Sequence, residues 1–110
     1  MALTQWRRPR TIRLPGNYTI KVVYWSEKKI KANLAKDGSL FDKDLLGFWD
    51  VATQSIVINS SEPLWVQIKT LAHELVHATH DYGHWLEQVY VDPIMQEVGE
   101  TALDEMEDDE

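Results

Sequence analysis

The chain has 110 residues, of which 44% are hydrophobic and five are tryptophan, which suffices for one domain with a single modest core. The absence of cysteine excludes disulfide bonds, thiolate metal ligands and a cysteine nucleophile. No apolar run is long enough to cross a membrane, and the N-terminus lacks the apolar segment of a signal peptide. We therefore expect a cytoplasmic protein with no membrane contact.

The net charge of −7 is spread unevenly along the chain. Six of the seven residues in the segment 104–110 are acidic, which predicts a disordered, solvated tail. Residues 1–16 are predicted to form a basic arm, whose arginines are Arg7, Arg8, Arg10 and Arg13. Such an arm is usually a solvated lead-in, so we do not expect a nucleic-acid partner. Contact with nucleic acid or an acidic protein is the alternative interpretation.

Strand patterns come first along the chain and helical patterns follow. Residues 18–25 alternate and are rich in β-branched and aromatic side chains, which predicts a first strand after a turn at residues 15–17. The lysine-rich segment 26–36 is consistent with either a short helix or a loop. Residues 45–51 and 55–59 are predicted to form a hairpin through the turn between them.

A long helical pattern begins at residues 60–61, where serine is followed by Glu62 and Pro63. Its apolar positions recur at helical spacing, which predicts a stripe that faces the core. The stripe consists of Leu64, Ile68, Leu71 and Leu75, broadened by Trp65, Ala72 and Val76. At about 100° per residue, His73 and His77 fall roughly 130° to 170° from the middle of this stripe, so we expect them to line a groove.

Residues 73–77 read His-Glu-Leu-Val-His, an H-E-x-x-H motif within this helix. Two histidines four residues apart lie on one helical face, about one turn from each other, so both rings can bind one metal ion. Glu74 then lies beside the open coordination position, where it can act as a general base. The motif predicts a zinc site with His73 and His77 as ligands. The alternative is an amphipathic helix with surface histidines and an ordinary solvated glutamate.

The motif helix resembles the active-site helix of the zincin metallopeptidases over residues 70–78, and residues 55–59 resemble the strand before that helix. The similarity is to short, single-domain members, including ImmA/IrrE-like and small phage-type peptidases. It implies that the strand borders the substrate cleft, that the two histidines hold zinc and that the glutamate is the general base. The resemblance is looser over residues 85–103, and residues 1–50 carry no matching motif.

A catalytic zinc site usually has three protein ligands, so a third ligand is expected after the motif. The metzincin pattern fails, because it requires glycine at position 80 and histidine at position 83, where this chain has His80 and Gly83. Asp92 and Pro93 instead predict the start of a second helix, which extends to about Met106.

Glu97 on this second helix is the predicted third ligand. Nineteen residues, 78–96, separate it from His77, which is similar to the spacing in gluzincins. The alternatives that the sequence leaves open are Glu100, His80, His84 and Asp81. An oxyanion donor is expected nearby, and the sequence offers Tyr82, His84 and Tyr90 without favouring one of them.

The predicted fold is α+β: a small, mostly antiparallel sheet packed on the H-E-x-x-H helix and followed by a C-terminal helix, in a domain of residues 17–103. The predicted function is zinc-dependent hydrolysis of peptide bonds. In this mechanism the metal lowers the pKa of its water from about 15.7 toward about 7, and Glu74 transfers the proton. An extended peptide or protein substrate is expected to pair with the edge of strand 55–59.

The alternative function is a zincin-like binding or regulatory module, with structural zinc or no metal, that acts through protein or nucleic-acid contacts. The intact Glu74 favours the enzyme, because a purely structural metal site does not need that carboxylate. The sequence makes no prediction of the oligomeric state.

Overall fold

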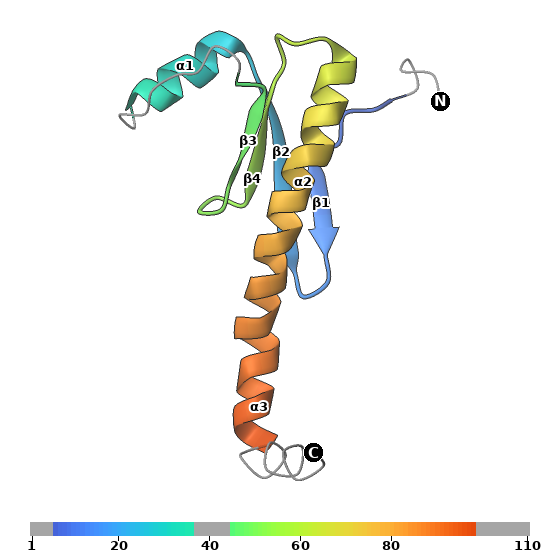
Figure 1. Cartoon of the computed structure of the whole chain (residues 1–110), viewed down its shortest axis with the longest axis vertical. Coiled ribbons are helices and arrows are strands. Elements are labelled where there is room, and N and C mark those ends of the chain that lie inside the picture. The colour runs from blue at the N-terminus through green and yellow to red at the C-terminus, as the bar shows by residue number, and fades with distance from the viewer. Residues whose placement is uncertain (1–5, 37–44, 99–110) are drawn as a thin grey trace, which may run out of the picture. The chain divides into compact units, whose positions relative to one another are not determined.

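The computed structural model describes residues 6–36 and 45–98, and the chain divides into two compact units, Met1–Thr79 and His80–Glu110. In chain order the elements are β1 (Thr11–Leu14), β2 (Tyr18–Trp25), α1 (Glu27–Lys36), β3 (Gly47–Asp50), β4 (Ser55–Asn59), α2 (Leu64–Leu86), η2 (Glu87–Val91) and α3 (Asp92–Val98) (Figure 1). The predicted acidic tail lies outside the described residues.

The four strands form one mixed sheet in the order β1-β2-β4-β3. β1 pairs with β2, and β3 pairs with β4, in antiparallel register, so the predicted hairpin is present. β2 and β4 pair in parallel, with Val22 opposite Ile56 and Tyr24 opposite Ile58. A parallel pair needs a long connection, which residues 26–54 supply with α1 and β3. The α+β class is confirmed, while the sheet predicted as mostly antiparallel has a parallel pair at its centre.

The strand pair at the start of the sheet lies partly in the segment predicted as a basic arm. Residues 11–14 form β1 and pair with residues 18–21 of β2. The turn between the strands places Gly16 at φ 87° and Asn17 at φ 63°, a left-handed region that glycine and asparagine adopt at low cost. β1 escapes sequence prediction because it is a short edge strand whose residues alternate between exposed and only half-buried.

The segment after β2, which the sequence leaves open between helix and loop, forms α1. The Ser26 hydroxyl accepts a hydrogen bond of 3.3 Å from the backbone N–H of Lys29, as a helix N-cap does. Ser61 Oγ accepts a second one, of 3.1 Å, from the backbone N–H of Glu27. Ile30 is fully buried, so α1 is anchored by packing as well as by its cap.

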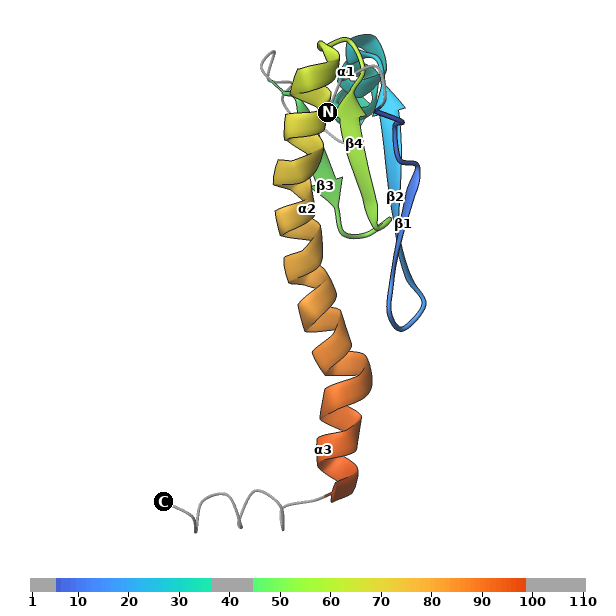
Figure 2. The same ribbon diagram turned by 90° about the vertical axis from the view of Figure 1, so that its right-hand side faces the viewer.

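In the first unit, α2 lies across one face of the sheet (Figures 1 and 2). A Cβ added to Gly47 would lie 2.7 Å from Thr70 Cγ2, so the face of β3 that carries Gly47 points toward α2. Gly47 is opposite Ile58 in the ladder, which places the isoleucines of β4 on the same face. The core between sheet and helix consists of Ile20, Val22, Ile56, Ile58, Leu71 and Ala78, each at most 5% exposed.

The buried face of α2 differs from the predicted apolar stripe. It consists of Gln67, Thr70, Leu71, Glu74 and Ala78. Trp65 and Val76, which the apolar pattern places beside the core, are 58% and 67% exposed. Two of the polar residues on this face, Gln67 and Thr70, have side-chain donors that are satisfied within the helix and its approach. Gln67 Nε2 donates to the Glu62 carbonyl and Thr70 Oγ1 to the Val66 carbonyl, each at 2.8 Å.

The second unit is helical over all its described residues. α2 ends at Leu86, and η2, a π-helical segment, joins it to α3 without a turn. The separate second helix predicted to begin at an Asp92 N-cap is therefore wrong, because Asp92 has helical φ and ψ of −60° and −45° and its backbone N–H donates to the Glu87 carbonyl. The predicted extension to about Met106 lies beyond the described residues. Pro93 has no N–H, and the π-helical turn before it accommodates the lost hydrogen bond. No helix within residues 6–36 and 45–98 is long and apolar enough to cross a membrane.

Candidate active site

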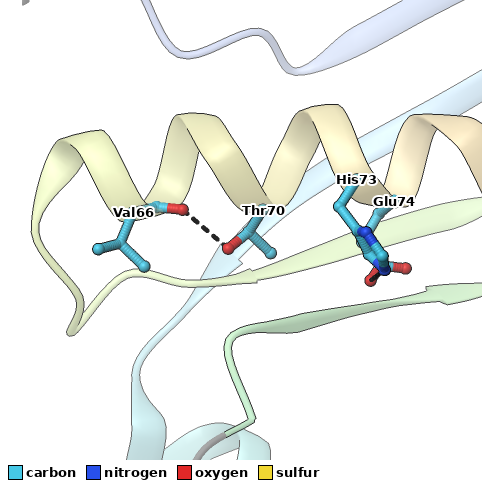
Figure 3. Close-up of polar contacts among 4 residues, drawn as sticks. All are labelled: Val66, Thr70, His73 and Glu74. Atoms are coloured by element: carbon cyan, nitrogen blue, oxygen red, sulfur yellow. Dashed lines mark hydrogen bonds and ion pairs between the residues drawn. The ribbon is translucent and has the colours of Figure 1, made fainter.

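The H-E-x-x-H motif lies on the part of α2 that packs on the sheet. The rings of His73 and His77 are edge to face, with centroids 5.1 Å apart and planes at 76°. Figure 3 shows Thr70, His73 and Glu74 projecting from the same side of α2. His73 Nε2 lies 4.0 Å from Glu74 Oε1. The motif thus brings two imidazoles and one carboxylate together on a single helical surface.

The two residue types of the motif differ in burial. The His73 side chain is 70% exposed, whereas that of Glu74 is only 11% exposed. Glu74 occupies the face of α2 that packs on the sheet, together with Leu71 and Ala78. The ordinary solvated glutamate of the alternative interpretation is therefore absent at this position. A carboxylate at such a position loses much of its hydration, which is costly unless a partner compensates for the loss.

A cavity of about 270 Å³ opens beside this carboxylate. Its walls come from α2 and from the approach to β3, and consist of Leu46, Gly47, Lys69, Thr70, His73 and Glu74. Gly47 is needed there, since a Cβ would lie 2.5 Å from the Val57 carbonyl oxygen. The glycine lets β3 approach the helix closely, so that the strand borders the groove in which His73 lies.

The strand that borders the groove is β3 and not β4. The sequence assigns the substrate-pairing edge to residues 55–59, but β4 lies between β2 and β3, with strand partners on both sides. That prediction was wrong because the order of strands in a sheet depends on pairing between distant segments. Among the described strands β3 is at the end of the sheet on this side, so its outer edge is the one beside the motif.

The predicted third ligand lies in the second unit. Glu97 belongs to α3 and is exposed, and Glu100 lies outside the described residues. Within residues 6–36 and 45–98, no group of three or more histidine, cysteine or acidic side chains is arranged to hold a metal ion. The two motif histidines are adjacent imidazoles, a residue type that suits zinc, and their role as ligands remains a prediction. Glu97 remains a prediction from its spacing.

The other candidate residues of the second unit contact one another. His84 Nε2 lies 3.3 Å from His80 Nε2. The Tyr82 ring stacks on Trp85 at a centroid distance of 6.2 Å, and the Tyr90 ring meets Trp85 edge to face at 5.8 Å. The predicted oxyanion donors thus have packing roles, and their part in the reaction remains a prediction.

Sequence reasoning missed most of the cavity wall. Lys69 and Thr70 precede His73 by about one helical turn, and that spacing was a usable signal. Gly47 had no such signal, because its proximity to Thr70 arises only when β3 and α2 pack together.

A second, larger cavity of about 750 Å³ lies at the end of β2. It is lined by Trp6, Arg8, Arg10, Val22, Val23, Tyr24, Trp25, Lys29 and Leu64. Two of its cations lie over aromatic rings: the Arg8 guanidinium is 5.3 Å from the Tyr24 centroid, and Lys29 Nζ is 4.8 Å from the Trp25 centroid. The Tyr24 hydroxyl donates a 2.9 Å hydrogen bond to the Pro9 carbonyl. Burial raises the pKa of Tyr24 above its ordinary value of 10.0, and the charges of Arg8 and Arg10 oppose that shift in part.

Comparison with known proteins gives one match. Residues 29–98 match the family described as Peptidase_M78, the IrrE N-terminal-like domain. The matched segment covers more than half of the chain and includes the H-E-x-x-H motif, both strands beside it and Glu97. Comparisons with curated proteins and with solved structures gave no match.

Proposed function

Since the chain belongs to the IrrE N-terminal-like domain (Peptidase_M78) family, a family of zincin-like metallopeptidase domains, we propose that it is a zinc-dependent enzyme that hydrolyses peptide bonds. The observation that carries this proposal is the setting of Glu74. Its carboxylate is nearly buried, lies 4.0 Å from the His73 ring and borders a cavity of about 270 Å³. A helix that merely displayed its charges to solvent would not bury this one.

The metal ligands in this proposal are His73, His77 and Glu97. The two histidines fit a zinc ion because their rings are adjacent and exposed, and because imidazole and carboxylate are suitable zinc ligands. Glu97 is proposed on its nineteen-residue spacing from His77, and Glu100, His80, His84 and Asp81 are the alternatives. A zinc ion held there would act as a Lewis acid toward water and toward the carbonyl of the scissile bond.

Glu74 is proposed as the general base. It accepts the proton of the attacking water and delivers it to the amine that leaves when the peptide bond breaks. Packing on the sheet holds the carboxylate against the cavity, so little movement is required of it during proton transfer. The histidines are more exposed, which leaves the outer side of the groove open to a substrate.

The substrate in this proposal is an extended segment of a peptide or protein. The outer edge of β3 lies beside the cavity, and backbone groups at a sheet edge bind extended chains by adding them as a strand. Leu46 and Lys69 both line the cavity, so each is available to contact a side chain of the bound segment.

A binding or regulatory module is the second candidate function, and the larger cavity favours it. Arg8, Arg10 and Lys29 gather there among aromatic rings in a chain whose net charge is −7. Such a surface is suited to an acidic protein segment or a nucleic acid. This role does not require the H-E-x-x-H motif.

One experiment separates the two candidates. Protein purified without chelator is analysed for metal by mass spectrometry, and is then incubated with a peptide library with and without a chelator. We expect zinc to copurify, a subset of peptides to be cleaved, and the chelator to abolish cleavage until zinc is restored. Bound zinc with no cleavage of any peptide would favour the module instead.

A further inference from the structure

The second unit contains another pair of histidines four residues apart. His80 and His84 follow the H-E-x-x-H motif on α2, and both are exposed. Their rings lie edge to face, with centroids 4.7 Å apart and planes at 84°. The two Nε2 atoms are 3.3 Å apart, within hydrogen-bond distance, and the tautomers decide which nitrogen donates. With Glu97 as the third ligand of the motif site, the proposed peptidase mechanism uses neither of these two histidines.

The distance between the two Nε2 atoms can be compared with a hydrogen bond and with the spacing of two ligands on one metal ion. Hydrogen bonds donated by N–H groups have typical lengths of about 2.9–3.0 Å, so 3.3 Å is a long one. Two nitrogen ligands on a tetrahedral zinc ion, each about 2.0–2.1 Å from the metal, are about 3.3–3.4 Å apart. The observed separation of 3.3 Å matches the spacing of two nitrogens that share a metal ion, once both rings turn their lone pairs toward it.

We propose that His80 and His84 form a second metal site, separate from the H-E-x-x-H site, for a borderline divalent cation such as Zn²⁺, Ni²⁺ or Cu²⁺. Imidazole nitrogen is a preferred ligand for these ions, and Mg²⁺ and Ca²⁺ prefer oxygen. Water completes the coordination, since both side chains are on the solvent side of the helix. The order of affinities for such ligands predicts that Cu²⁺ binds more tightly than Zn²⁺.

The consequence of binding is local to the helix. None of the residues from 80 to 97 is buried, so this part of the helix has little of the tertiary packing from which most helices derive their stability. A metal ion that binds two rings one turn apart requires that turn to be helical, and it therefore stabilises the helical form by mass action. Metal binding at this site would therefore stabilise the last turns of α2 in the helical form.

The test uses the full-length chain and counts metal equivalents. Metal-free protein is titrated with Zn²⁺, and stoichiometry is read by native mass spectrometry and calorimetry. We expect two equivalents for the wild type and one for the His80→Ala/His84→Ala variant. The His73→Ala/His77→Ala variant should also retain one, so a failure of the peptidase site can be told from a failure of this one.

A matched variant keeps the composition and changes only the spacing. In Tyr82→His/His84→Tyr the two histidines are two residues apart, and side chains at that spacing do not face each other on a helix. It should lose the second equivalent as the double alanine variant does. Far-UV circular dichroism should show a metal-induced gain of helix in His73→Ala/His77→Ala and no gain when His80 and His84 are also replaced.

Three results would overturn the proposal. One is a single equivalent in the wild type. Another is two equivalents in the His80→Ala/His84→Ala variant, which would assign the second ion to other residues. The last is loss of both equivalents in that variant, which would make the pair part of the motif site.

Discussion

Residues 64–79 and residues 80–98 are both helical, and each segment presents a pair of histidines four residues apart. The first segment buries five residues, and in the second none of residues 80–97 is buried. His73 and His77 therefore flank a nearly buried carboxylate beside a cavity, whereas His80 and His84 are exposed and contact each other. Helical spacing is enough to pair two imidazoles, but a site for catalysis also needs a base that tertiary packing holds in place.

The largest effect is expected from the first histidine pair. Either His73→Ala or His77→Ala removes one of the proposed ligands, so peptide cleavage should fall to the uncatalysed background and zinc at the motif should be lost. Activity and bound metal are measured on the same preparation. Gln88→Ala, an exposed substitution in the second segment, is the control and should leave both unchanged. Full activity in both histidine variants would mean that residues 64–79 do not contain the catalytic metal site.

The next effect concerns stability and compares two isoleucines. Ile58 is fully buried in β4, and Ile58→Ala leaves a cavity that should cost about 2–5 kcal/mol in the free energy of unfolding. Ile94 in α3 is 55% exposed, so Ile94→Ala should change it by less than about 0.5 kcal/mol. Urea unfolding followed by circular dichroism measures both. Equal losses would mean that the second segment has a core of its own.

Alanine substitutions at two glycines, one in each segment's surroundings, should change the stability of the protein in opposite directions. Gly47→Ala places a Cβ 2.5 Å from the Val57 carbonyl oxygen, and the resulting overpacking should destabilise the protein by about 1–3 kcal/mol. An added Cβ at Gly83 meets nothing within 4 Å in the described residues, so Gly83→Ala should stabilise the helix by about 0.5–1 kcal/mol. Thermal unfolding of the two variants should therefore shift in opposite directions, and a shift of the same sign in both would contradict the packing described.

The smallest effect is a pH dependence within the first unit. Burial raises the pKa of Tyr24, so the neutral phenol stabilises the folded state. This contribution is complete below the unfolded pKa of about 10 and is lost as pH rises through the higher folded value. The stability advantage of wild type over Tyr24→Phe should thus shrink between about pH 8 and about pH 11. Denaturant titrations at both pH values measure the difference in free energy of unfolding between the two proteins. A difference that grows with pH would contradict the raised pKa of Tyr24.

Much of the fold follows from local patterns in the sequence. The alternation of residues 18–25 predicted β2, and the hairpin pattern predicted β3 and β4. The motif helix was predicted from its apolar spacing and its serine-proline start. These features are determined by neighbours within a few residues, so the sequence alone identifies them.

The rest depends on contacts between distant segments. The parallel pairing of β2 with β4 places β4 inside the sheet, and no local pattern distinguishes that order from another. The burial of Glu74 was hidden for a similar reason. A helical wheel based on apolar residues gives no weight to Gln67 and Thr70, although their side-chain donors are satisfied locally and both are buried. When they are included, the buried face of α2 also contains Glu74.

The central claim is that Glu74 is a general base held against the cavity, and Glu74→Gln tests it most directly. The amide is nearly isosteric and cannot accept the proton, so zinc content should stay at the wild-type level while the rate of peptide cleavage falls about 10²–10⁴-fold. Glu87→Gln, an exposed change in η2, should keep the wild-type rate. A Glu74→Gln enzyme that cleaves as fast as the wild type would contradict the account.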